Sequence, residues 1–492
     1  MRDHLLLSVN GTLERVRGDD AFATLSTFLR ERLRLTGTKV VCAEGDCGAC
    51  SVLVAREPAP DDEGPTPLDW QPVDSCIAFL HQLDGCHVLT VEGIPPAAGA
   101  ELHPVQDALI EHFGSQCGFC TPGFVTTLAG AAETARRAGR AALDPHGTRR
   151  ALTGNLCRCT GYLQILEAAA AVPVAACPPL DAVLAPETRA ALALAAAETV
   201  RVAAGDRTVS IPRAIEEATA ILTGDPETRV VAGATDLGVL YNKGRLEPRP
   251  VLQLGPRIPG FDRVEIAGGR LRAGAGASWT ALLDAVRDEV PAFAAILERF
   301  GAPQIRTLGT VGGNLANASP IADSLPFLLV MDAVVEVSGP RGVRRVPIGG
   351  FYRSYKETAL EPGELIAAIE VPLPAPDELL RLRKLSRRRD LDISSVTAAF
   401  RLAFEGERIV RARIAFGGVG PVVLRTPGAE RLVEGGVLDL ELARRAGRLA
   451  REEVAPITDV RGAAEYRARL VENLFTELAH ELLAAPSSAA GG

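Results

Sequence analysis

The sequence has 492 residues, of which 47% are hydrophobic and 23% charged, and its formal net charge is −8 at pH 7. This length predicts several domains, and an acidic chain with 4% aromatic residues is a poor partner for nucleic acid, which needs basic faces and stacking rings. No apolar run is long enough to cross a membrane and the start lacks a signal-peptide cleavage site, so we expect a cytoplasmic protein.

Short elements of mixed type follow one another up to residue 92. Two apolar runs at 4–10 and 12–16, joined by Asn10-Gly11, predict a β-hairpin. Apolar spacing over 24–35 predicts a helix, a glycine- and cysteine-rich loop covers 42–50, and 51–55 predicts a strand. Residues 1–92 are therefore expected to form a small α+β domain.

Helical patterns dominate residues 93–175. The first helix is expected to open at Pro104 and to end at Gly114, since proline favours the first position of a helix and glycine the position after its end. Three more are predicted over 123–140, from Asp144-Pro145 to Leu152, and over 161–172. The Pro- and Ala-rich segment 176–204 is predicted to be a linker.

Strand and helix patterns alternate beyond residue 204. For 205–378, which we expect to be a mixed α/β domain, the strands are predicted at 229–232, 251–254, 263–266 and 271–273, and the helices at 211–223, 278–289 and 291–300. Residues 379–488 predict a C-terminal α+β domain, with strands near 397–404 and 409–416 and helices from 439 onward. The fold class is thus multidomain α+β.

All ten cysteines lie in the first 180 residues, and in a cytosolic chain such clusters indicate metal binding rather than disulfides. The pattern C-x4-C-x2-C…C, typical of a plant-type [2Fe–2S] cluster, is formed by Cys42, Cys47, Cys50 and Cys76. Glycines at 45 and 48 allow the tight turns that such a loop needs. A zinc knuckle is the alternative, but zinc ligands usually come as C-x2-C pairs.

A second set of four thiols is formed by Cys117, Cys120, Cys157 and Cys159. Their spacing alone leaves zinc and a second [2Fe–2S] cluster open. Both pairs precede predicted helices, whose N-termini favour an anionic group of either kind. The redox cluster expected upstream favours a second cluster here. The two remaining cysteines, Cys86 and Cys177, are interpreted as small buried apolar residues.

The segments CAEGDCGACSV, QCGFCTPG and NLCRCTGY resemble the iron–sulfur portion of the xanthine dehydrogenase family of molybdenum hydroxylases. The resemblance implies a plant-type ferredoxin-like β-grasp domain over 1–92, a four-helix [2Fe–2S] domain over 93–175 and a two-lobed FAD-binding domain over 205–378. One departure stands in the first loop, where Ala43 and Asp46 occupy positions at which the family usually has glycine. Asp tolerates a left-handed backbone, whereas Ala does so poorly.

Two glycine-containing segments, RVVAGATDLG at 229–238 and GTVGGNLANASPIAD at 309–323, are weak evidence for a phosphate site by themselves, because such loops are more often plain turns. They resemble the two FAD-binding segments of the same family. The resemblance implies FAD contacts from Val230, Val231, Ala232, Gly233, Ala234, Thr235, Asp236, Leu237, Thr310, Gly313, Asn314, Asn317 and Asp323. It also implies that Phe300 lies against the flavin ring and that Ile366 and Lys384 line it.

The resemblance further implies an electron-transfer subunit of a heterotetramer with two small and two large subunits. Electrons would leave a molybdopterin centre on the large subunit, where hypoxanthine and xanthine are oxidised to urate. They would pass through the cluster of Cys117, then the cluster of Cys42, to FAD and on to NAD+. No catalytic residue for the substrate is expected on this chain. The alternatives are a molybdenum hydroxylase for an aldehyde or N-heterocycle, and a zinc-stabilised scaffold protein without a redox role.

Overall fold

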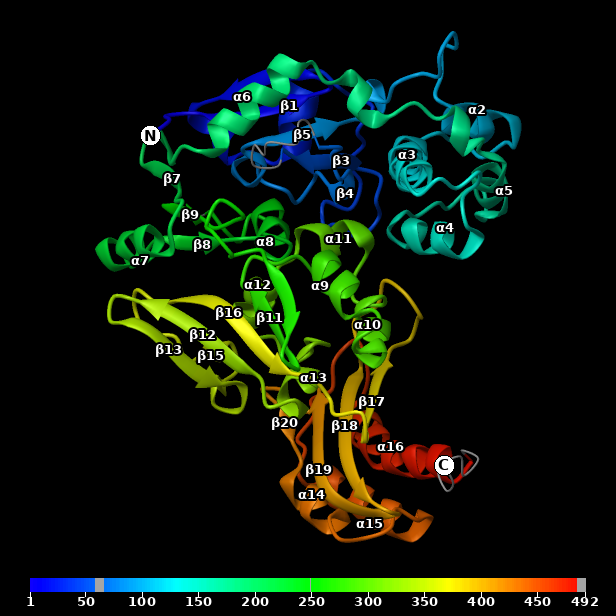
Figure 1. Cartoon of the computed structure of the whole chain (residues 1–492), viewed down its shortest axis with the longest axis vertical. Coiled ribbons are helices and arrows are strands. Elements are labelled where there is room, and N and C mark those ends of the chain that lie inside the picture. Colours follow the sequence, from blue (N-terminus) through cyan, green and yellow to red (C-terminus); the bar gives the residue numbers. More distant parts are fainter. Residues whose placement is uncertain (58–65, 248, 485–492) are drawn as a thin grey trace. The chain divides into compact units, whose positions relative to one another are not determined.

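The computed structural model describes residues 1–57, 66–247 and 249–484, which divide into two compact units (Figure 1). The first unit contains residues 1–262, 278–280 and 301–313. The second unit contains 263–277, 281–300 and the described residues from 314 onward. Each unit has its own sheets and its own buried core, and each is described by itself.

A five-stranded sheet opens the first unit, in the order β2 (Thr12–Val16), β1 (Leu5–Val9), β5 (Cys86–Leu89), β3 (Ser51–Arg56) and β4 (Gln71–Asp74). Strands β1 and β2 pair antiparallel, which confirms the hairpin at Asn10-Gly11, and β1 pairs parallel with β5. The helix expected over 24–35 is shorter: α1 (Leu25–Thr27) continues as one wide turn over Phe28–Arg32. Leu25 and Leu29 on this segment are fully buried in the core of the sheet.

The helical module of the first unit contains α2 (Pro104–Glu111), α3 (Thr121–Arg137), α4 (Pro145–Ala151) and α5 (Leu163–Ala171). The predicted end of α2 at Gly114 was wrong. The left-handed residue that ends the helix is Phe113, with a φ of 53°, one residue before the predicted Gly114. Gly114 N donates to Leu109 O at 2.7 Å. The Asp144 cap of α4 is confirmed, since its carboxylate accepts Gly147 N at 2.5 Å.

The segment 176–204, predicted to be a linker, is packed rather than extended. It forms α6 (Pro186–Ala196) and β6 (Val200–Ala204), and Leu180 and Leu192 are fully buried. Strand β6 begins the second sheet of this unit, in the order β6, β7 (Arg207–Ile211), β9 (Val251–Gln253), β8 (Arg229–Val231). Three further helices belong to the unit: α7 (Ile215–Gly224), α8 (Leu237–Asn242) and α11 (Pro303–Leu308).

Within the described ranges, no single helix is long and apolar enough to cross a membrane. One bent helical pair, Leu163–Ala171 with Val174–Val183, passes on length and composition alone. Its residues Ile165, Ala168 and Val174 are buried in the core of the helical module.

The second unit holds an antiparallel sheet in the order β10 (Val264–Ala267), β11 (Arg270–Gly274), β16 (Leu365–Pro372), β12 (Val334–Gly339), β13 (Gly342–Pro347). Between β11 and β16, the chain also forms α9 (Trp279–Val286), α10 (Pro291–Leu297), α12 (Val311–Asn317), α13 (Leu325–Val330) and the paired short strands β14 (Tyr352–Ser354) and β15 (Glu357–Thr358). Helices α9 and α12 begin in the first unit and continue into the second.

A second sheet of this unit runs in the order β17 (Glu378–Leu385), β18 (Val396–Glu405), β19 (Arg408–Gly417), β20 (Leu424–Arg425). Helices α15 (Leu440–Glu452) and α16 (Ala464–Ala484) follow it, as predicted for the chain beyond 439, and α14 (Pro427–Val433) precedes them where no helix was predicted. The rings of Phe400, Phe416 and Phe475 meet in the core between this sheet and α16, with centroids 5.3–6.2 Å apart.

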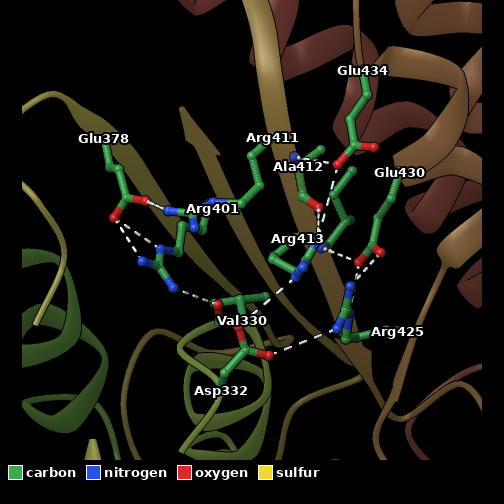
Figure 2. A network of polar contacts seen from close by, with 11 residues as sticks. Val330, Asp332, Glu378, Arg401, Arg411, Ala412, Arg413, Arg425, Glu430 and Glu434 are labelled. Carbon is green, nitrogen blue, oxygen red and sulfur yellow. Dashed lines mark hydrogen bonds and ion pairs between the residues drawn. The ribbon is translucent and has the colours of Figure 1, made fainter. Parts of the chain in front are cut away.

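Buried carboxylates connect these strands to α13 and α14 (Figure 2). Glu378 accepts a hydrogen bond from Arg401 Nε at 2.9 Å, and Arg401 Nη1 also donates to Val330 O at 3.2 Å. Glu430 accepts from Ile414 N at 2.7 Å and from Arg425 Nε at 2.8 Å. The side chains of Glu378 and Glu430 are 2% and 5% exposed, so these bonds offset the cost of removing each charge from water.

Replacing Glu430 by Ala should lower the free energy of unfolding of the second unit by about 3 kcal/mol, because the Arg425 guanidinium and Ile414 N–H then lose their acceptor. Calorimetry of the transition that belongs to this unit measures the loss. The matched control is Glu361→Ala, which breaks an ion pair with Arg341 whose side chains are 75% and 44% exposed and which should cost less than about 1 kcal/mol. Equal losses in the two variants would contradict a structural role for the buried carboxylate.

Candidate cofactor-binding sites

The four thiols of the first cysteine set lie close together in a chain of contacts. Cys42 lies in hydrogen-bond contact with Cys47 and with Cys76, and Cys76 in turn with Cys50. Hydrogen bonding from Cys47 and Cys76 lowers the pKa of the Cys42 thiol far below its ordinary value, while the same contact raises the pKa of Cys47.

Backbone N–H groups of the 42–50 loop point at the Cys42 sulfur. Glu44 N and Asp46 N donate to Cys42 Sγ at 3.4 and 3.5 Å. The loop reaches this shape with positive φ values of 54° at Ala43, 70° at Gly45 and 65° at Gly48. Ala43 therefore does adopt the left-handed conformation that its Cβ disfavours. N–H donors around paired thiolates suit a [2Fe–2S] cluster, whose potential depends on hydrogen bonds to sulfur.

The second cysteine set is paired, Cys117 with Cys159 and Cys120 with Cys157. Cys120 is the residue before the first turn of α3, where N–H groups and the helix dipole favour an anion. Thr160 donates to Cys157 Sγ from its backbone N at 3.5 Å and from its hydroxyl at 3.2 Å. Cys157 is buried, whereas Cys117 and Cys159 are exposed.

Two thiol pairs are the ligand set of two irons, each of which takes two thiolates. Each set gathers four thiols, the number that a two-iron cluster requires, and the residues present fit that group. The two cysteines outside the sets, Cys86 and Cys177, are buried as predicted, at 3% and 4% exposure.

The loops that carry the two cysteine sets touch each other within the first unit. Leu156 N, next to Cys157, donates to Cys47 O at 2.9 Å. A Cβ on Gly123 of α3 would lie 2.1 Å from Gly48 O, so only glycine permits this contact. Gln304 of α11 is fully buried. Its side-chain amide donates to Ser51 Oγ at 3.0 Å and to Asn155 Oδ1, on the loop of the second cysteine set, at 3.2 Å.

The first predicted FAD segment is a turn between β8 and α8. Ala234 in this turn has a φ of 56°. A Cβ on Gly233 would lie 2.1 Å from Leu308 O, and a Cβ on Gly309 would lie 3.7 Å from Thr235 Oγ1. The first FAD segment therefore meets the start of the second, residues 309–313, within the first unit, and backbone turns of this kind can bind phosphate. These residues fit the pyrophosphate part of a flavin dinucleotide.

The second FAD segment is not the open loop that the sequence predicts. Residues 311–317 form α12, and Thr310 Oγ1 accepts Gly313 N at 3.1 Å as the cap of its first turn. Glycine pairs are poor helix formers, so local propensity did not indicate this helix. The capping hydroxyl was already among the predicted FAD contacts.

A buried polar cluster that the sequence analysis missed holds the first FAD turn. Gln82 Nε2 and Gln253 Nε2 both donate to Ala232 O, at 2.9 and 3.2 Å. His81 Nδ1 lies 2.7 Å from Gln253 Oε1. An amide oxygen can only accept a hydrogen bond, so His81 Nδ1 is the donor of this pair. Burial lowers the pKa of His81 to about 4. No motif marks these residues, since their partners are distant in the sequence.

Another missed residue lies beside the first cysteine set. Asp74 is fully buried, its carboxylate contacts Cys50 Sγ at 3.6 Å and Ser51 Oγ at 3.5 Å, and burial raises its pKa to about 7.

The predicted FAD contacts of the second unit have partners inside that unit. Lys384 forms a buried ion pair with Asp323, whose other oxygen accepts Ser394 Oγ and Thr397 Oγ1, both at 2.6 Å. Two asparagines are also engaged: Asn314 Oδ1 accepts Ser324 Oγ at 2.8 Å, and Asn317 Oδ1 accepts Lys356 Nζ at 2.6 Å. Ile366 is buried in β16 and Phe300 is half-buried after α10. Their contacts with FAD stay predictions.

Four protein families match successive parts of the chain. They are described as 2Fe-2S iron-sulfur cluster binding domain (residues 7–81), [2Fe-2S] binding domain (90–170), FAD binding domain in molybdopterin dehydrogenase (205–374) and CO dehydrogenase flavoprotein C-terminal domain (381–482). The fold and the matched families together define a multidomain α+β iron–sulfur flavoprotein that binds [2Fe–2S] clusters and FAD.

Individual relatives narrow this class. Xanthine dehydrogenase of Drosophila pseudoobscura pseudoobscura is 32% identical over 96% of this chain, and aldehyde oxidase 3 of Rattus norvegicus is 28% identical over 95%. The chain spans only 38% of the length of each. A solved chain of the Cu,Mo-CO dehydrogenase is 30% identical with a TM-score of 0.52, and the match covers 55% of this chain and 94% of that one. The chain belongs to the molybdenum hydroxylase family, as its iron–sulfur and flavin electron-transfer part.

Replacing Gly233 by Ala should release FAD while both clusters stay in place, because the added Cβ forces the turn away from Leu308 O. We expect at least a tenfold weaker FAD affinity, equivalent to about 1.4 kcal/mol. The ratio of FAD to iron after gel filtration measures it. Gly255→Ala is the control, since nothing lies within 4 Å of the Cβ there and its φ is not positive. A Gly233→Ala protein with full FAD content would refute this role.

The neutral state of buried His81 should make folding sensitive to acid. The unfolded histidine binds its proton near its ordinary pKa of 6.5 and the folded one only near 4, so stability is lost as the pH falls through this interval, by at most roughly 3 kcal/mol. Urea unfolding at several pH values should show a shallower pH slope for His81→Gln than for the wild type. The exposed His146→Gln variant should keep the wild-type slope. Identical slopes in the His81 variant and the wild type would contradict the prediction.

Proposed function

We propose that the chain is the electron-transfer subunit of an NAD+-dependent xanthine dehydrogenase. The electron path in this proposal rests on the continuous contact within the first unit, and the xanthine dehydrogenase assignment rests on the likeness to the Drosophila enzymes. The loop of the second cysteine set touches that of the first through Leu156 and Cys47, and α11 leads from the buried Gln304 to the FAD segment at 308–310. Bound clusters supply one-electron transfer, and bound flavin couples it to two-electron hydride transfer to NAD+.

The residues of this path have separate tasks. Cysteine pairs hold the clusters, with Cys157 buried and Cys117 exposed, which favours electron entry at the second set from a partner. The 233–235 turn and Thr310 orient the dinucleotide end of FAD. Substrate oxidation belongs to a partner that carries molybdopterin, in a cytoplasmic heterotetramer of two small and two large subunits.

The partner is proposed from the relatives. The xanthine dehydrogenases of Drosophila are longer than this chain, which spans 38% of them, so their remaining length has no counterpart here. In the Cu,Mo-CO dehydrogenase, 94% of one chain matches 55% of this chain, so that part forms a separate polypeptide there. The zinc scaffold alternative is no longer supported, because both cysteine modules match [2Fe–2S] domains. An aldehyde or N-heterocycle substrate remains the second candidate, favoured by the aldehyde oxidase relative.

Xanthine should reduce NAD+ when this chain is combined with its molybdenum partner, and Cys157→Ser should abolish that activity. The variant should lack one of two [2Fe–2S] signals in electron paramagnetic resonance but retain FAD, because its serine oxygen replaces a thiolate. Cys177→Ala, a buried cysteine outside both sets, should keep both signals and the activity. A complex that is inert to xanthine but oxidises an aldehyde or quinoline would replace the substrate assignment. Normal turnover by Cys157→Ser would contradict the electron path.

A further inference from the structure

Helix α8 carries the FAD turn at one end and contacts the first cysteine loop at the other. It begins at Leu237, directly after the 232–236 turn, and ends at Asn242. Asn242 Nδ2 donates two hydrogen bonds, one to Ala43 O at 2.9 Å and one to Cys76 O at 2.8 Å. Because both acceptors are carbonyl oxygens, only the nitrogen of the side-chain amide can face them. One side chain therefore joins the two chain segments that supply Cys42 and Cys76.

The bond to Ala43 acts on a peptide group that also contacts sulfur. The carbonyl of Ala43 and the N–H of Glu44 belong to one planar trans peptide and point in opposite directions. Asn242 holds the carbonyl, and on the other side Glu44 N donates to Cys42 Sγ at 3.4 Å. Fixing the oxygen therefore fixes the direction of the N–H toward the sulfur.

The backbone at this point needs such support. Ala43 has a φ of 54°, a left-handed conformation that an alanine adopts less readily than a glycine. Without a bond to its carbonyl oxygen, the 43–44 peptide is free to rotate toward an unstrained conformation. That rotation removes the N–H donor from Cys42 Sγ. Hydrogen bonds to the sulfur stabilise the reduced cluster, which is more negatively charged than the oxidised one. Losing such a bond therefore makes the reduction potential more negative.

We propose that Asn242 is a positioning residue for the first cluster: it holds the 43–44 peptide so that Glu44 N–H donates to the sulfur of Cys42. The residue sets the potential of this cluster without touching iron, substrate or flavin. Helix α8 thereby fixes the cluster loop and the FAD turn through one rigid element. The inference rests on the [2Fe–2S] cluster of the proposed electron path but not on its substrate.

The test is Asn242→Leu, which has a similar size and cannot donate. The whole chain is purified with its clusters and titrated with dithionite, and the two [2Fe–2S] signals are followed by electron paramagnetic resonance. We expect the potential of the first cluster to become more negative and its line shape to change, while the second cluster is unaffected. Because Asn242 is exposed at the end of α8, the substitution leaves the buried core intact.

Lys243→Gln is the matched control. Lys243 is the next residue and forms an ion pair of 2.7 Å with Glu44 on the same loop, but their side chains are 44% and 45% exposed and hold no peptide group. At high ionic strength this variant should keep the wild-type potential, since exposed charges are then screened.

A second variant tests the strain directly. Ala43→Gly combined with Asn242→Leu should recover part of the lost potential, because glycine adopts positive φ without penalty. Loss of the first cluster alone in Asn242→Leu, restored by Ala43→Gly, would also support the proposal. An iron-loaded Asn242→Leu protein with wild-type potential and line shape would overturn it, as would loss of both clusters without recovery. These measurements do not use xanthine. They therefore test the role of Asn242 even if the substrate assignment is wrong.

Discussion

Direct contact between backbones, possible only at glycine, determines how the cofactor segments of the first unit lie together. A Cβ would sit 2.1–2.3 Å from a carbonyl oxygen at several glycines, among them Gly123 on Gly48, Gly238 on Ile77 and Gly233 on Leu308. These contacts join the second cysteine module to the first loop, the residue after Cys76 to α8, and the first FAD segment to the start of the second. Electron transfer falls steeply with distance, so a side chain at any of them would lengthen the path as well as cost stability.

The sequence was most informative where chemistry is local. Cysteine spacing indicated both ligand sets, Asn10-Gly11 indicated the hairpin, and Asp144 indicated a helix cap, because each signal lies within a few residues of its effect. It was least informative for residues that act across the fold, such as Gln304 and Asn242. Their amide groups have no motif, and their partners lie between about 150 and 250 positions away. Helix α12 was missed for a different reason, since its glycine pair has low helix propensity.

In the second unit, buried charged side chains are paired with other groups of the protein. Asp323 and Lys384, which the family resemblance places near flavin, are satisfied by each other and by two hydroxyl groups. Glu378 and Glu430 are likewise held by arginines and backbone donors (Figure 2). Buried ion pairs are costly to break one partner at a time, so these groups give the unit a fixed arrangement around which a ligand can bind.

The two cysteine sets differ in their access to solvent, and this difference has a chemical consequence. Cys50 and Cys76 are 2% exposed, whereas Cys117 and Cys159 are at the surface beside Phe119. Thiolates are oxidised according to their exposure and ionisation. Oxidation by air would therefore reach Cys117 and Cys159 before the buried Cys50 and Cys76.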